Sequence, residues 1–145
     1  MALRCPQAAL EAVLRHGEQS YPYECCGLLL GKFQDGCRQV TAIEPLRNAN
    51  TESPRTRYDL DPREHLAAQR SARARGLEII GFYHSHPDHP AQPSQYDLDH
   101  AAWPGYSYLI VSIARGRRAP AGAAHSFELA EDRSRFLPES LEPIP

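Results

Sequence analysis

The sequence predicts a single α/β domain, and three observations support this prediction. A chain of 145 residues has the usual length of one domain, and a second hydrophobic core would need more sequence. Its 41% apolar and 23% charged residues are typical of a globular chain that closes one core. Helix and strand signals also alternate along it, which requires layers of both kinds. We expect the core at about residues 5–130 and a tail with little periodicity at about 131–145.

The first half of the chain is predicted to begin with an amphipathic helix and to continue in strands. Apolar residues recur at helical spacing from Pro6 to about Glu18. The nearly continuous apolar run Cys25–Gly31 indicates a strand buried on both faces, with Glu24 at its entrance. Gln39–Ile43 is expected to pair with this strand, and Thr56–Leu60 is expected to form a brief further strand.

The second half is predicted to alternate a helix, a strand, a helix and two strands. Asp61 can cap a helix that begins with a proline, and the run that follows it is helical in pattern. The next segment is rich in β-forming residues and stops at a proline, which cannot donate to a ladder. The expected ranges are a helix at 61–76, a strand at 77–86, an irregular loop at 87–93, a helix at 94–102, and strands at 106–113 and 124–129.

Charge, cysteine content and hydropathy exclude several classes of function. A net charge of -2 argues against nucleic acid as the main partner, and we interpret Arg115, Arg117 and Arg118 as a solvated loop. The four cysteines include the adjacent Cys25 and Cys26, which lack zinc-ribbon spacing, so we expect reduced, partly buried thiols. We find neither the apolar stretch of a signal peptide nor a membrane span, and we therefore expect a cytoplasmic protein with no membrane partner.

Two short motifs together predict a metal site. Side chains two apart on a strand share a face, so His84 and His86 can present both imidazoles to one point while Ser85 faces away. Side chains three apart on a helix also share a face, so Ser94 and Asp97 can face that point if the loop folds back. Two histidines and one carboxylate make a complete ligand set for a catalytic zinc, which keeps a fourth position for water.

Each motif also has a simpler interpretation. Two histidines at a strand end are commonly a polar rim, and Ser94 with Asp97 resembles a helix capping box. The combination is harder to dismiss. From the residue frequencies of this chain, H-x-H-P followed at fixed spacing by S-x-x-D should arise by chance with a probability on the order of 10⁻⁴. The combined pattern therefore favours a metal site.

The motifs resemble those of the JAMM (MPN-type) family of zinc metalloproteases. Residues 22–31 resemble its P-x-E-x-C-G-L-L-x-G signature. Residues 84–87 and 94–97 resemble its H-S/T-H-P and S-x-x-D signature, with no departure at a catalytic position. The resemblance covers roughly residues 5–130. Its less specific part, between the two signatures, consists of Asn48, Pro54, Tyr58 and Asp61-Pro62. It implies a cytidine-deaminase-like α/β fold in which a mixed, curved sheet is flanked by helices.

The resemblance implies a role for each residue of the site. His84, His86 and Asp97 would bind zinc, Glu24 would orient the zinc-bound water, and Ser94 would help to hold the tetrahedral intermediate. Physical chemistry is consistent with these roles. Zinc gives a water nucleophile at neutral pH, a carboxylate can carry a proton to the leaving amine, and a hydroxyl can donate to an oxyanion.

The implied reaction is hydrolysis of a peptide or isopeptide bond. The implied substrates are ubiquitin-like or sulfur-carrier proteins of the ThiS/MoaD type, cleaved after a Gly-Gly tail that could add to a strand edge. Two alternatives remain open. The chain could be a non-catalytic binding module of the same fold, although its complete motif argues against this. It could also be a zinc deaminase, although the combination of H-x-E and P-C-x-x-C patterns that is typical of that class is absent.

The remaining polar and aromatic candidates are predicted to support the site or the core. The acids and histidines that flank the motif are expected at the rim of the site, because three ligands already fill it. Cys26 is expected to be a packed small residue. The rim residues are Asp88, His89, Asp99 and His100, and the aromatic residues expected in core or helix-end packing are Trp103, Tyr106 and Tyr108.

Overall fold

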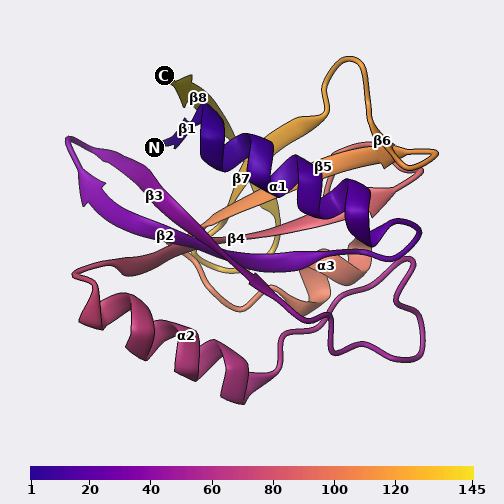
Figure 1. Ribbon diagram of the computed structural model, residues 1–145. Coiled ribbons are helices and arrows are strands. Elements are labelled where there is room, and N and C mark those ends of the chain that lie inside the picture. The colour runs from indigo at the N-terminus through magenta and orange to yellow at the C-terminus, as the bar shows by residue number, and fades with distance from the viewer.

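A computed structural model describes residues 1–145, which form eight strands and three helices (Figure 1). In chain order they are β1 (Ala2–Pro6), α1 (Gln7–Ser20), β2 (Cys26–Gln34), β3 (Cys37–Leu46), α2 (Pro62–Ala74), β4 (Glu78–Pro87), α3 (Gln95–His100), β5 (Ser107–Ala114), β6 (Arg117–Arg118), β7 (Ala124–Leu129) and β8 (Phe136–Ile144). None of the helices is long and apolar enough to span a membrane.

All strands belong to one mixed sheet that curves back on itself. Its order is β4-β2-β3-β1-β8-β7-β5-β6, and β4 also pairs with β5. The pairs β1–β3, β1–β8 and β4–β5 are parallel, whereas the other pairs are antiparallel. The β4–β5 pairing closes the sheet into a barrel, which confirms the prediction of a mixed, curved sheet flanked by helices.

The apolar residues form two core clusters on opposite faces of the curved sheet. The first includes Leu3, Leu29 and Leu109 and is covered by Val13 of α1. The second contains residues of the opposite face, such as Phe82, and is covered by α2 and α3. Figure 1 shows α1 and α2 on opposite sides of the strands. The central strands β4 and β5 are therefore buried on both faces, and so is the first part of β2, as the continuous apolar run there predicts.

Close packing between β2 and β4 requires a glycine. Gly27 pairs with Tyr83, and a Cβ atom at residue 27 would lie 2.4 Å from Cε2 of that tyrosine. The Tyr83 ring therefore lies against bare backbone, and its hydroxyl meets Nδ1 of His16 at 2.7 Å. This contact ties α1 to the strand that carries the predicted metal ligands.

Several elements differ from the sequence predictions. Thr56–Leu60 forms no strand, because its backbone groups serve a loop tied to Asn48 rather than a ladder. The expected tail contains β8, which pairs with β1 and β7 at the centre of the sheet order. Long-range pairing alone identifies β8, since its sequence lacks regular alternation. The second predicted helix ends at Ala74, and the third covers only Gln95–His100.

Two charged clusters join distant elements. Arg118 binds Glu11 and Glu18 of α1, so the basic segment that we expected to be a solvated loop is partly an ion-pair contact with the first helix. Arg38 of β3 is buried and binds Glu128 and Glu139, which belong to β7 and β8. The second cluster thus connects strands on both sides of β1.

Candidate metal centre

His84 and His86 lie at the end of β4, where the strand is buried between β2 and β5. The register of β4 is fixed because His84 pairs with Cys26 of β2 on one edge and with Ile110 of β5 on the other. Ser85 faces away from them, as its alternation predicts, and its Oγ accepts a hydrogen bond of 2.8 Å from the Cys25 amide. The two imidazoles therefore share one face of a strand that is held on both edges.

Ser94 and Asp97 form a capping box that also serves the site. Ser94 Oγ accepts from the Asp97 amide at 3.0 Å, and Asp97 Oδ2 accepts from the Ser94 amide at 2.9 Å. The capping interpretation is thus correct. It does not exclude a metal site, because the same Asp97 carboxylate also reaches both histidines. The Ser94 oxygen is used only as an acceptor in the cap, so its proton remains available to donate.

The three predicted ligands converge on one point. Asp97 Oδ2 lies 3.1 Å from Nε2 of His84 and 3.0 Å from Nε2 of His86, and the two Nε2 atoms are 3.1 Å apart. Ligands bound to one tetrahedral zinc at about 2.0–2.1 Å would lie about 3.3 Å from each other. All three residues are buried, and they form a group able to hold a metal ion. The donor set and its spacing therefore fit a divalent metal.

Hydrogen bonding assigns the tautomer of His86. Its Nδ1 lies 2.9 Å from the carbonyl oxygen of Pro90, which can only accept, so Nδ1 carries the proton. With the proton on Nδ1, Nε2 is the nitrogen whose lone pair can face the site. Tyr58 stacks on the His84 ring, with centroids 4.4 Å apart. The backbone of the loop after β4 and an aromatic ring thus hold the two imidazoles in place.

Burial and neighbouring groups tune the charges of the ligands. Burial lowers the pKa of His84 and outweighs the opposing effect of Asp97, so this imidazole stays neutral as a metal ligand must. Burial opposes ionisation of Asp97, but the two histidines and the Ser94 amide hold the pKa of its carboxyl well below the usual range. The cluster therefore offers a neutral His84 nitrogen and an anionic Asp97 oxygen beside Nε2 of His86.

Glu24 lies beside this cluster at the entrance of β2. Cys26 pairs with His84 in the antiparallel β2–β4 ladder. Continuing this register by two residues places Glu24 next to His86. Its backbone is fixed by the carbonyl of Pro54 and by the amide of Asn48. The side chain is only 4% exposed, and Oε1 has no hydrogen-bond partner. Burial, with the charge of Asp97, raises the pKa of Glu24 to about 9.

The flanking candidates stay outside the ligand cluster. None of Asp88, His89, Asp99 and His100 joins the group able to hold a metal. Asp88 instead accepts hydrogen bonds from the Tyr21 hydroxyl and the Arg115 amide. Cys26 is buried, and burial raises the pKa of its thiol to about 12, which describes a packed and unreactive residue.

Sequence reasoning did not identify two features of the site. The first is the hydrogen-bonded contact between Asp59 and Tyr96, two residues that are far apart in sequence. The second is the exposure of Trp103, which we expected in core or helix-end packing. Trp103 is 46% exposed, yet its ring stacks on Phe82 three residues after the end of α3, which agrees with helix-end packing, and Tyr108 is buried as expected.

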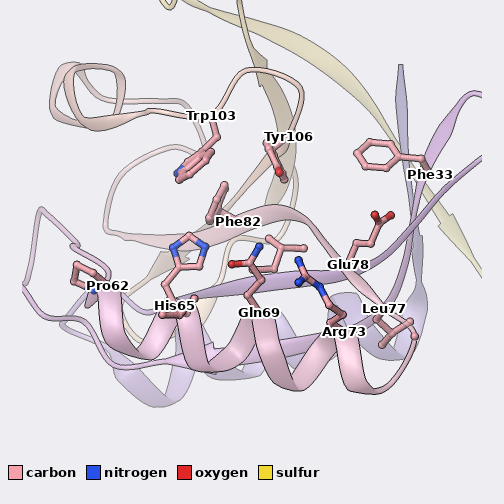
Figure 2. A pocket seen from close by; sticks show the side chains of 13 residues that line it. Phe33, Pro62, His65, Gln69, Arg73, Leu77, Glu78, Phe82, Trp103 and Tyr106 are labelled. Atoms are coloured by element: carbon pink, nitrogen blue, oxygen red, sulfur yellow. The ribbon is translucent and has the colours of Figure 1, made fainter.

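A cleft leads from the metal cluster to a groove beside α2. The cleft, of about 360 Å³, includes Tyr58, Tyr96 and Asp97 among its walls. It shares four lining residues with a groove of about 540 Å³, namely Pro62, His65, Phe82 and Trp103. Figure 2 shows His65, Gln69 and Arg73 of α2 pointing into this groove, opposite the aromatic rings of Phe82, Trp103 and Tyr106.

Comparisons with known proteins support a common ancestry with peptidases. A family model described as prokaryotic homologs of the JAB domain matches residues 6–127. The desampylase of Haloferax volcanii is 36% identical over 92% of this chain and 92% of its own length. A probable TtuB-protein conjugate cleaving protease of Thermus thermophilus is 36% identical over 71% of this chain and 66% of its own. A solved protein from Desulfitobacterium hafniense has a TM-score of 0.80 and 33% identity, covering 98% of this chain and 94% of that one.

Proposed function

Because the chain belongs to the family of prokaryotic homologs of the JAB domain, we propose that it is a zinc-dependent peptidase or isopeptidase. Its reaction is hydrolysis of bonds that join ubiquitin-like or sulfur-carrier proteins to other groups, after the Gly-Gly tail of the carrier. The relatives with desampylase and conjugate-cleaving activities support this substrate class. The similarity to peptidases supports a hydrolase, and zinc as the metal is part of the proposal.

One observation carries the proposal, namely the meeting of His84, His86 and Asp97 within 3.1 Å of one another. A binding module without catalysis would have no need for three buried polar groups whose lone pairs face one point. The same module would also have no need for a fourth buried polar group, the Glu24 carboxylate, with an unpartnered oxygen. The complete set therefore favours an enzyme over the binding module.

Each residue of the chain has a distinct task in this reaction. A zinc ion held by the two histidines and Asp97 would lower the pKa of a bound water to about 7 and polarise the scissile carbonyl. Glu24 accepts the proton of the attacking water and returns it to the leaving amine. Ser94 donates a hydrogen bond from its hydroxyl to the carbonyl oxygen as negative charge develops there. Burial and the charge of Asp97 raise the pKa of Glu24, and the positive charge of a bound zinc would offset this increase, so that Glu24 is ionised and can act as the base.

The shape of the access route supports a substrate with an extended tail. A folded carrier protein can rest on the groove beside α2, and its tail can continue through the narrower cleft to Asp97. The groove offers aromatic surface together with Gln69, Arg73 and Glu78 as polar partners. Such a mixture suits a protein surface better than a small apolar ligand.

The proposal is tested with a sulfur-carrier protein extended past Gly-Gly. We expect the zinc-loaded protein to release the extension, and mass spectrometry should locate the cut directly after the second glycine. Glu24→Gln keeps the size of the side chain and should lower kcat/KM by roughly 10²–10⁴ without loss of bound zinc. Glu52→Gln, the same change at an exposed residue, should have no effect. Full cleavage by Glu24→Gln would remove this residue from the mechanism.

A further inference from the structure

A side-chain bridge spans the two walls of the cleft next to the metal cluster. Tyr96 of α3 donates a hydrogen bond of 3.0 Å from its hydroxyl to Oδ1 of Asp59, which belongs to the loop between β3 and α2. The amide of Asn50 donates to the other oxygen of Asp59 at 2.9 Å and lies 3.5 Å from the Tyr96 hydroxyl. Three side chains thus form one hydrogen-bonded contact between the loop and α3.

The tyrosine that forms this bridge is held in place from several directions. The Arg57 guanidinium lies over its ring at 4.5 Å, and the His100 ring stacks on it at 3.8 Å between centroids. On the loop side, Asn50 Oδ1 also accepts from the Ser53 amide at 2.8 Å. A ring with these contacts moves only at the cost of several interactions, so the bridge is a fixed part of the wall.

The position of the bridge relates it to the substrate path. Asp59 and Tyr96 both line the cleft of about 360 Å³, and Tyr96 directly precedes the ligand Asp97 in the chain. At its other end, near Trp103, the cleft joins the groove beside α2. A tail that runs from the groove to Asp97 would therefore pass the wall that carries the bridge.

We propose that the Asp59–Tyr96 bridge determines specificity by restricting the residue before the scissile bond to glycine. This inference rests on the proposed function and deepens it. The charge-assisted hydrogen bond ties the loop to α3, so the two walls cannot separate to admit a side chain. Glycine has no Cβ and lets its backbone approach the walls closely, whereas even alanine adds a methyl group at the point where they are joined.

The test compares two carrier fusions that differ only in the residue before the scissile bond, Gly-Gly and Gly-Ala. The measured quantity is the ratio of their kcat/KM values with the zinc-loaded protein. Tyr96→Phe keeps the ring and removes the bridging hydroxyl, and we expect it to reduce the preference for glycine roughly tenfold, because a hydrogen bond to a charged group contributes about that factor. Asp59→Ala removes the other partner and should shift the ratio in the same direction.

Matched controls separate this inference from general damage and from failure of the proposed function. Tyr23→Phe removes the hydroxyl of an exposed tyrosine and should leave the ratio at the wild-type value. Wild-type protein that cleaves both fusions equally, or bridge variants that keep the wild-type ratio, would overturn the inference and leave the proposed function standing. Wild-type protein that cleaves neither fusion would overturn both. Thermal unfolding of each variant confirms that the ratio is measured on folded protein.

Discussion

Replacing Arg38 by methionine should destabilise the protein strongly, although this residue lies outside the metal cluster. Its guanidinium is buried and binds Glu139 at 2.6 Å, Glu128 at 2.7 Å and the carbonyl of Gly105 at 3.0 Å. The Glu139 side chain is 0% exposed, so it has no access to water when its cation is removed. Methionine fills a similar volume without charge, and the variant therefore isolates the loss of the ion pair.

The size of the effect follows from the burial of Glu139. Removing one partner of a buried ion pair costs about 3–5 kcal/mol, because the other charge is left uncompensated. A chain of this length has an unfolding entropy of about 0.3 kcal/mol/K, so the expected fall in Tm is about 10–16 °C at pH 7. The hydroxyls of Ser107 and Ser126, which donate to Glu139 Oε1, limit the loss but do not replace the positive charge.

The destabilisation of Arg38→Met should depend on pH in a defined direction. Burial raises the pKa of Glu139 above its ordinary value of 4.5, while the two serines and Arg38 counteract this. A carboxyl whose pKa is raised in the folded state contributes stability at pH values below its pKa in the unfolded chain. This contribution is lost as the pH rises through the folded-state pKa. Removal of the Arg38 cation enlarges the upward pKa shift of Glu139. The loss of unfolding free energy in Arg38→Met should therefore be larger at pH 7 than at pH 4.

Urea unfolding followed by circular dichroism measures these differences. The double variant Arg38→Met/Glu139→Gln has no buried charge left without a partner and should recover most of the lost stability. Arg15→Met, at a position where the side chain is 62% exposed, should change stability by less than about 0.5 kcal/mol. A decrease in Tm below about 3 °C for Arg38→Met at pH 7 would refute the reasoning.

Three further predictions concern the site and its scaffold. Asp97→Asn keeps an acceptor for the Ser94 amide but removes the anionic ligand, so zinc binding should be roughly hundredfold weaker. Competition with a chromophoric chelator measures this affinity, and an unchanged value would exclude Asp97 as a ligand. Ser94→Asn keeps a good helix cap without the hydroxyl, so kcat should fall about 10²-fold with little change in KM, and a change in KM alone would contradict an oxyanion role. Asp61→Ala removes the cap of α2 and should cost about 1 kcal/mol, or a Tm shift of about 3 °C in calorimetry, with kcat/KM retained; a larger loss would indicate a role beyond capping.

The sequence by itself determined the chemistry of the site. The alternation of a strand places His84 and His86 on one face, and helical spacing places Ser94 and Asp97 together, so each pair is defined by local geometry. Glu24 could not be assigned in the same way, because it precedes a strand that is distant in sequence. Its place beside the cluster was predicted only through the family resemblance, and the β2–β4 register supplies the physical reason.

The tertiary structure decided everything that depends on contacts between distant segments. The pairing of β8 with β1 joins residues more than 130 positions apart, and no local periodicity marks the segment as a strand. The Asp59–Tyr96 bridge and the exposed Trp103 likewise arise where the loop, α3 and β4 meet. Local patterns restrict which face a side chain occupies, whereas the partner it meets there is fixed only when the sheet closes and the burial of both cores outweighs the loss of chain entropy.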